Sequence, residues 1–99
     1  MNPIQQMMQQ ANKMKRELKK AEEELNAKEF TVSKGGAVTV TLMGDKSVKS
    51  VNIDKDAFDP DNKEMVEEMI ALAISEAISK IEQEIRAYKE RITGSPEGY

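Results

Sequence analysis

The feature that most constrains this chain is an unbroken apolar seam that runs through its first quarter. Apolar side chains recur there at alternating spacings of three and four residues. The members of this seam are Ile4, Met7, Ala11, Met14, Leu18, Ala21 and Leu25. This spacing places all of them on one narrow stripe of an α-helix, which packs against another helix better than against a broad core. Because Pro3 also suits the first turn, the sequence predicts a helix over residues 3–28.

The segment over residues 30–53 alternates apolar and polar residues in three short runs, which is typical of strands. Gly35 and Gly36 accept the positive φ angles that a tight hairpin turn needs. The apolar residues of the runs are Phe30 and Val32, then Val38, Val40 and Leu42, then Val51 and Ile53. Val48 has the opposite parity to Val51, which predicts a bulge or a twist near the preceding turn. We expect a three-stranded antiparallel meander whose Thr-rich face meets water.

A second long helix is predicted from about residue 60 to Ile92. Asp59 before Pro60 is typical of an N-cap followed by proline in the first turn. Alternatively, Asp61 caps the helix and Glu64 completes a capping box. Gly94 is a natural C-terminal stop, and we expect residues 95–99 to form a disordered tail.

The apolar face of this second helix changes width along its length. Its first half is broad and should cover the sheet with Met65, Val66, Met69, Ile70, Leu72, Ala73, Ile74 and Ala77. Its second half narrows to a seam of Ile78, Ile81, Ile85, Tyr88 and Ile92. A helix of ~30 residues is ~45 Å long, so both helices must extend past a small sheet, and within one chain their seams can pack together. Open sheet edges and unburied apolar surface predict a homodimer, formed by sheet pairing, helix packing or both.

Composition excludes several classes of function. The 99 residues include no cysteine and no histidine, which removes disulfides, thiolate metal sites and the commonest general base. Ser75 and Ser79 therefore have no histidine to activate them. The acidic stretch from Asp54 has Asp59 where a calcium loop needs glycine, so capping explains it better than a metal. No apolar run reaches membrane-spanning length. We expect a soluble, intracellular, non-enzymatic protein of one domain over residues 1–94, with no cofactor and no metal.

Charge is distributed unevenly along the chain, whose formal net charge is −3. Residues 1–20 carry five cations and one glutamate, a net charge of +4. Residues 54–68 carry seven acidic residues and two lysines, a net charge of −5. The two regions therefore have opposite electrostatic characters.

The cations of residues 13–20 are the main candidates for binding. The seam phase places them on the outer face of the helix or at its flank, where amide side chains extend the same surface. The candidate set is Lys13, Lys15, Arg16, Lys19, Lys20, Gln9 and Asn12. Exposed cations suit phosphates, and the lack of nearby aromatic residues favours duplex over single-stranded nucleic acid. The alternative is an ordinary solvated helix face, which is common for such a charge run.

A second group of cations lies in the C-terminal helix. Its members are Lys80, Arg86, Lys89 and Arg91. Because Glu76, Glu82, Glu84 and Glu90 alternate with them, we expect salt bridges along that helix rather than a binding surface.

Taken in order, these segments resemble the YbaB/EbfC family of bacterial nucleoid-associated proteins. The resemblance rests on QQANKMKRELKKAEEEL, KGGAVTVTLMG, SVKSVNID, DPDNKEMVEEMIALAISEAISK and the terminal ITG, and it covers nearly the whole chain. It implies an α-β-β-β-α protomer of the α+β class, with two long protruding helices in a tweezers-like homodimer. It also implies DNA binding without catalysis, a place in the cytoplasm at the nucleoid, and partners among replication or recombination proteins.

Residue by residue, Lys13 and Lys20 match positions where the family usually carries lysine. Gln9 stands where a lysine is frequent, so one expected phosphate contact is missing. Ser75 and Glu76 replace the more usual Asn and Asp. The implied function is duplex binding through backbone phosphates; the alternative is a dimeric adaptor or chaperone-like module, which the low net basic charge favours.

Overall fold

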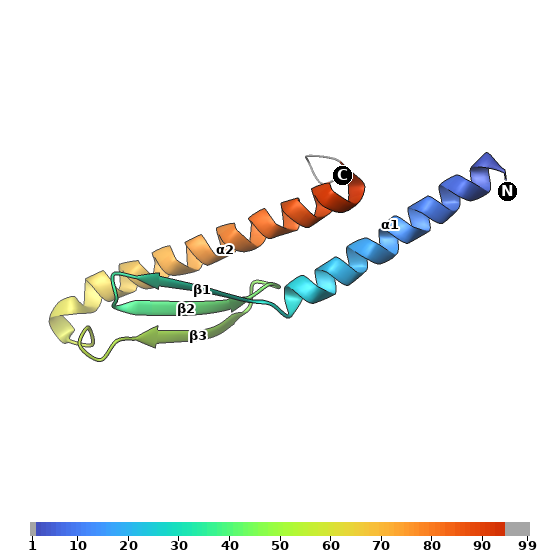
Figure 1. The fold of residues 1–99 in the computed structure, drawn as a ribbon. Coiled ribbons are helices and arrows are strands. Elements are labelled where there is room, and N and C mark those ends of the chain that lie inside the picture. Colours follow the sequence, from blue (N-terminus) through green and yellow to red (C-terminus); the bar gives the residue numbers. More distant parts are fainter. Residues whose placement is uncertain (1, 95–99) are drawn as a thin grey trace.

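The computed structural model describes residues 2–94, which form a three-stranded sheet with one long helix on one of its faces and a second long helix that extends from its end. The elements are α1 (Pro3–Asn26), β1 (Glu29–Lys34), β2 (Val38–Met43), β3 (Val48–Ile53), the 3₁₀ turn η1 (Pro60–Asn62) and α2 (Lys63–Thr93). The predicted α-β-β-β-α order of an α+β chain is confirmed. The molecule is a rod of 71 × 21 × 14 Å (Figure 1). The predicted tail, residues 95–99, lies outside the described residues.

The sheet is an antiparallel meander in the order β1-β2-β3. Gly35 and Gly36 have φ angles of 56° and 66° and form the β1–β2 turn, as predicted. Thr41 pairs with Ser50, whereas the next residue of β2, Leu42, pairs with Val48. Lys49 is therefore an extra residue on β3, and the predicted bulge is confirmed.

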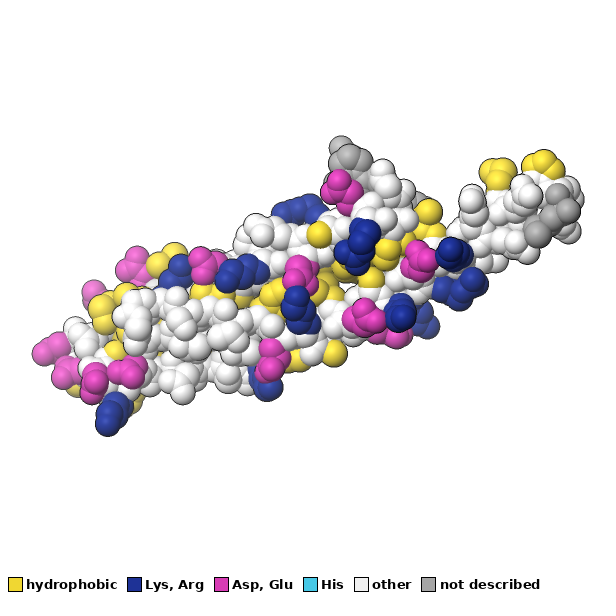
Figure 2. Space-filling model, viewed as in Figure 1, with side chains coloured by type: hydrophobic (Ala, Val, Ile, Leu, Met, Phe, Trp, Pro, Cys, Tyr) yellow, Lys and Arg dark blue, Asp and Glu magenta, His cyan; other side chains and the backbone are white. Residues whose placement is uncertain are grey.

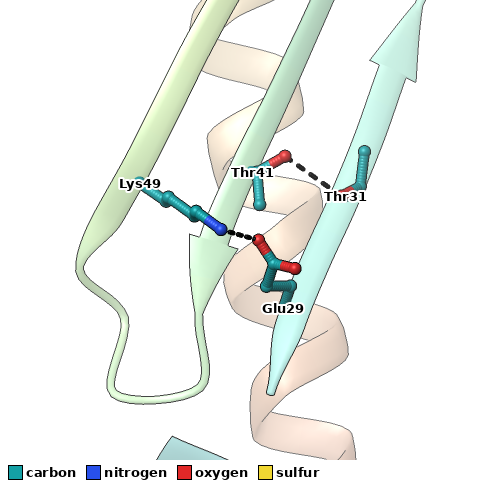
Figure 3. Close-up of polar contacts among 4 residues, drawn as sticks. All are labelled: Glu29, Thr31, Thr41 and Lys49. Atoms are coloured by element: carbon teal, nitrogen blue, oxygen red, sulfur yellow. Dashed lines mark hydrogen bonds and ion pairs between the residues drawn. The ribbon is translucent and has the colours of Figure 1, made fainter. Parts of the chain in front are cut away.

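One face of the sheet is polar. The hydroxyl oxygens of Thr31 and Thr41 lie 3.0 Å apart across β1 and β2 (Figure 3). The ammonium group of the bulged Lys49 pairs with the carboxylate of Glu29, which joins the two outer strands across β2. Exposed cross-strand pairs of this kind let an antiparallel sheet present one face to water.

The other face of the sheet packs against α2. Val38, Val40 and Leu42 of β2 are fully buried there, together with Ile81 of α2. Ala73 and Ala77 are also fully buried, and their small side chains let the helix approach the strands. The contacts of α2 with the sheet are made mainly with β1 and β2. A helix about 10 Å wide covers about two strands spaced ~4.8 Å apart, so β3 is only partly covered, with Ile53 packed against the core.

Two residues of the broad apolar face of α2 do not cover the sheet, and that part of the prediction is wrong. The side chains of Met65 and Leu72 are 41% and 53% exposed. The stripe that faces the strands contains Val66, Ala73 and Ala77. Met65 and Leu72 lie outside this stripe because a helix turns ~100° per residue and presents only one side to the sheet.

The start of α2 is set by Asp59. Its carboxylate accepts a hydrogen bond of 2.8 Å from the backbone N–H of Asp61, at the first turn of η1. Asn62, at the N-cap of α2 itself, makes no capping bond with its side chain. The Asp59–Pro60 start is therefore observed, and the alternative capping box from Asp61 is not. At the other end Gly94 has a φ of 73°, and its N–H donates to the carbonyl of Glu90, as a helix stop requires.

Asp59→Ala should destabilise the protein by about 1 kcal/mol, because the N–H of Asp61 loses its partner. Urea denaturation measures this loss. Asp56→Ala removes the same charge but no capping hydrogen bond, so it serves as the matched control.

Calcium should leave the melting temperature of the wild-type protein unchanged, and a calcium-dependent rise would reveal a metal site in this stretch.

The C-terminal end of α1 is fixed against the β2–β3 turn. The N–H of Gly44 donates a hydrogen bond of 2.9 Å to the carbonyl of Lys28. A Cβ atom on Gly44 would lie only 1.8 Å from the backbone oxygen of Leu25. Only glycine therefore allows the turn to lie so close to the end of α1, and this contact sets where the helix leaves the sheet.

Gly44→Ala should cost about 3 kcal/mol or more, because backbone must move to admit the methyl group. Gly36→Ala is the control, since nothing lies within 4 Å of its added Cβ and only its positive φ opposes the change. That control should cost about 1–2 kcal/mol. Equal losses for the two variants in urea denaturation would contradict the close approach at Gly44.

The seam of α1 packs against α2 only in the C-terminal half of α1. Leu25 is buried, and Leu18 and Ala21 are partly buried against the core. Towards the N-terminus the seam becomes exposed, and Ile4 and Met7 are each 69% exposed. The prediction that the two seams pack together is therefore confirmed only for the C-terminal half of α1. The rest of α1 projects past the end of α2 (Figure 1).

Candidate nucleic-acid interface

The predicted cations all lie on the exposed surface of α1. Lys13, Arg16 and Lys20 follow one another at spacings of three and four residues, so they share one side of the helix. Lys19 lies beside them and Lys15 lies at their flank. Because Leu18 and Leu25 turn inward, these cations point away from α2. The packing of the C-terminal half of the seam against α2 thus turns these cations towards solvent.

These five cations have no acidic partner. Within residues 2–94, the ion pairs are made by Lys28, Lys34, Lys46, Lys49 and Lys63, and the cations of α1 contribute to none. Glu17 lies four residues after Lys13 without pairing with it. The charges of this face are therefore free to meet an anion from outside.

The two amides of the candidate set extend this face. Gln9 and Asn12 are exposed, and within residues 2–94 neither side chain makes a hydrogen bond. Asn12 lines one shallow hollow with Gln9 and Met8, and a second hollow with Lys15 and Arg16. The candidate residues thus form one continuous strip, with neutral amides on the N-terminal side of the cations.

The cations of α2 differ from their expected pairing. Glu76, Glu82 and Glu84 bond across to Lys34, Lys46 and Lys28 of the sheet region rather than along the helix. In the described chain Lys80, Arg86, Lys89 and Arg91 are left without ion pairs. The expectation of salt bridges between these cations and the glutamates of α2 is therefore wrong, and an ion pair that does run along the helix joins Lys63 to Glu67 at its start. The cause is that the β-strands bring lysines close to glutamates that are far away in sequence.

Tyr88 and three glutamates mark the junction where α1 packs against α2, at the end of the basic stretch. Tyr88 is buried beneath α1, and this burial, with the negative charge of Glu22, raises the pKa of its hydroxyl above the ordinary value. The phenol therefore stays neutral at physiological pH. Glu22, Glu23 and Glu24 end the basic stretch, so the favourable surface for an anion lies on the projecting part of α1.

The acidic region lies at the other end of the rod. Acidic side chains gather around the start of α2, far from the tip of α1 (Figure 2). Asp54 and Asp59 accept hydrogen bonds from backbone N–H groups two residues on, which accounts for two of these carboxylates. Across residues 2–94, no three acidic side chains come close enough to hold a metal ion.

Sequence reasoning missed the exposure of β3. Val51 pairs with the fully buried Val40 and lies on the same face of the sheet, yet it is 44% exposed, and Val48 is 50% exposed. The width of a helix relative to three strands could have revealed this, because one helix covers only two of them.

Neither of the two long helices among residues 2–94 has an apolar stretch that could span a membrane.

A projecting helix with a face of unpaired cations is typical of proteins that bind nucleic acid. Comparison with known proteins narrows this class. The chain belongs to the YbaB/EbfC DNA-binding family, whose model matches residues 1–96, and the resemblance stated from the sequence is confirmed.

Curated relatives agree with this assignment. A nucleoid-associated protein of Clostridium novyi is 39% identical over 92 residues, which are 92% of this chain and 81% of that protein. A nucleoid-associated protein of Enterococcus faecalis is 36% identical over 100 residues, covering 100% of this chain and 96% of the relative. A nucleoid-associated protein of Mycoplasmopsis pulmonis is 38% identical over 95 residues, which are 96% of this chain and 91% of that protein.

Proposed function

We propose that this protein binds duplex DNA as a homodimer, through contacts from the cationic face of α1 to backbone phosphates. One observation carries the proposal: five exposed cations without ion pairs lie along the outer side and the flank of a helix that projects past the fold. Phosphate contacts of this kind bind DNA without reading its sequence. The protein would act in the cytoplasm, at the nucleoid, without catalysing a reaction.

The aromatic residues favour duplex over single-stranded DNA. Phe30 and Tyr88 are buried, and Phe58 is exposed only at the acidic end, so the described aromatic side chains offer no platform beside the cations. Single-strand binding proteins combine cations with aromatic rings on which bases stack.

The separation of charge makes binding compatible with a net charge of −3. The acidic and basic regions occupy opposite parts of a rod 71 Å long. Electrostatic interactions are screened over about 8 Å at physiological salt. The acidic end therefore repels a duplex held at α1 only weakly.

The homodimer is inferred from a partly uncovered apolar surface, which we call the β3 face. It consists of the exposed Val48 and Val51 of β3, together with the partly buried Ile53 and, on the adjacent flank of α2, the partly buried Ile70, Ile74 and Ile78. Ile74 and Ile78 continue the row of Ile70 at steps of four residues. The β3 face also borders the open edge of the sheet, where backbone groups lack strand partners. A partner related by a two-fold axis presents the same surface, so it would cover both the β3 face and the open edge of the sheet.

A second candidate function, a dimeric adaptor that grips another protein, is favoured by one observation. Phe58 is 78% exposed beside an apolar groove lined by Ile53, Val66 and Ile70, within the acidic region. Replication or recombination proteins would be the partners on this account, which is also the context that the family resemblance implies.

A gel-shift assay with random-sequence duplex at low and moderate salt tests the proposed function. We expect binding at low salt that weakens steeply as salt rises, because phosphate contacts release counterions. Absence of binding at low salt would contradict the proposal and favour the adaptor.

A further inference from the structure

The first eleven described residues form a distinct surface, which we call the α1 tip. Residues 2–12 contain no charged side chain, although one third of the whole chain is charged. Ile4, Met7 and Met8 are each more than half exposed there. The tip is therefore apolar on one side and carries neutral amides elsewhere.

No element of the described chain covers this seam. Helix α2 ends at Thr93, and the last α1 residues that pack against the core are Leu18, Ala21 and Leu25. The residues of the tip continue the same seam in the same phase, with Ile4, Met7 and Ala11 at steps of three and four. A seam in phase with an existing helix–helix contact is suited to another helix.

We propose that α1 tips of separate dimers pair seam to seam, and thereby link duplexes to which the dimers are bound. This inference rests on the proposed function, because it concerns what DNA-bound dimers do next. An antiparallel pair of tips would place Ile4 of each copy opposite Ala11 of the other, with Met7 at the centre. The cations from Lys13 onward would then lie outside the overlap, at opposite ends.

The chemistry of the tip favours a second copy as the occupant. Two identical helices can pack here without like charges opposing each other, because residues 2–12 are neutral. The small side chain of Ala11 permits close approach, and methionine adapts to irregular contacts. Met8 and Gln10 flank the seam, and the amide of Gln10 can hydrogen-bond across it.

The small size of the tip predicts when this pairing occurs. About three turns of helix bury far less than the roughly 800 Å² per partner of a stable interface. Free dimers should therefore pair only weakly. Dimers held close together on DNA have a high effective concentration, which makes a weak contact sufficient. The pairing should depend on DNA and appear as bridging between duplexes.

A bridging assay tests this inference with a matched pair of variants. An immobilised duplex captures a labelled free duplex through the protein, for wild type, Met7→Glu and Gln6→Glu. Both variants add one negative charge to the tip, but Gln6 lies on the polar side of the helix. Met7→Glu should reduce capture about tenfold or more, whereas Gln6→Glu should retain it. Affinity for a single duplex should be the same in the two variants.

Several results would overturn the inference. Equal capture by all three proteins would show that bridging uses the two arms of one dimer and not the tips. Equal loss in both variants would show a charge effect on DNA. A weaker single-duplex affinity in Met7→Glu than in Gln6→Glu would show that the tip contacts DNA. Wild-type protein that binds duplex without capturing a second one would refute tip pairing and leave the proposed function standing, whereas no duplex binding would refute both.

A cross-linking experiment gives a second, independent readout. The chain has no cysteine, so a single Met7→Cys can form a disulfide only with another copy. Mild oxidation on DNA should link protomers of separate dimers, so that the undenatured protein sediments as species larger than one dimer once the DNA has been digested, and Gln6→Cys should give few of them. Oxidised Met7→Cys protein that sediments as species no larger than one dimer would place the contact within dimers and overturn the inference.

Discussion

Replacing Lys13, Arg16 and Lys20 together by glutamine is expected to make the dependence of DNA affinity on salt much shallower. If each cation contacts one phosphate per protomer, six contacts disappear per dimer. The slope of log affinity against log salt should then fall by about five units, at ~0.9 per phosphate. This is the upper limit, reached when both arms engage one duplex. Fluorescence anisotropy with a short duplex over a salt series measures the slope.

A second triple variant is the matched control. Lys34, Lys49 and Lys63 to glutamine removes the same charge from lysines that are already ion-paired within the fold. Its slope should change little. An unchanged slope in the α1 variant would contradict the assignment and direct attention to Lys80, Arg86, Lys89 and Arg91. Helicity and dimer mass should be unaffected, because the three α1 cations lie off the seam.

Val51→Lys is expected to separate the dimer into protomers. In the wild-type dimer the partner would cover Val51, and a lysine ammonium in that apolar contact would be left without a partner. Sedimentation equilibrium at micromolar concentration should give roughly twice 11.1 kDa for wild type and 11.1 kDa for the variant. DNA affinity should weaken as well, because one arm then binds alone.

Ser50→Lys adds the same charge to the polar face of the same strand and should remain dimeric. A wild-type monomer would refute the homodimer. A Val51→Lys variant that stays dimeric would show that the protomers meet elsewhere, for example at the exposed Met65 and Leu72 on the other flank of α2.

Local patterns in the sequence predicted most of the fold. The seam from Ile4 to Leu25 predicted α1, and the parity of Val48 predicted the bulge that makes Lys49 the extra residue. Asp59 and Pro60 predicted the start of the second helix. These features depend on neighbours a few residues away, so sequence alone contains the information that determines them.

Features that depend on distant contacts were not predictable in the same way. The pairing of Glu84 with Lys28 joins residues 56 positions apart, and no periodicity of α2 indicates it. The exposure of Val51 and Leu72 follows from the position and width of α2 on the sheet rather than from their own neighbours. Similarly, the outward face of the α1 cations was predictable from the seam, but their lack of acidic partners became visible only in the structure.

Lysine protection by duplex DNA tests the central claim most directly. Lysines are acetylated briefly with and without random-sequence duplex at low salt, and each site is quantified by mass spectrometry. We expect DNA to protect Lys13, Lys19 and Lys20, and to leave Lys55 and Lys63 at the acidic end as reactive as in the free protein. Raising the salt from about 50 mM to about 200 mM should abolish the protection. Equal reactivity of Lys13, Lys19 and Lys20 with and without bound duplex would contradict the claim that α1 holds the DNA.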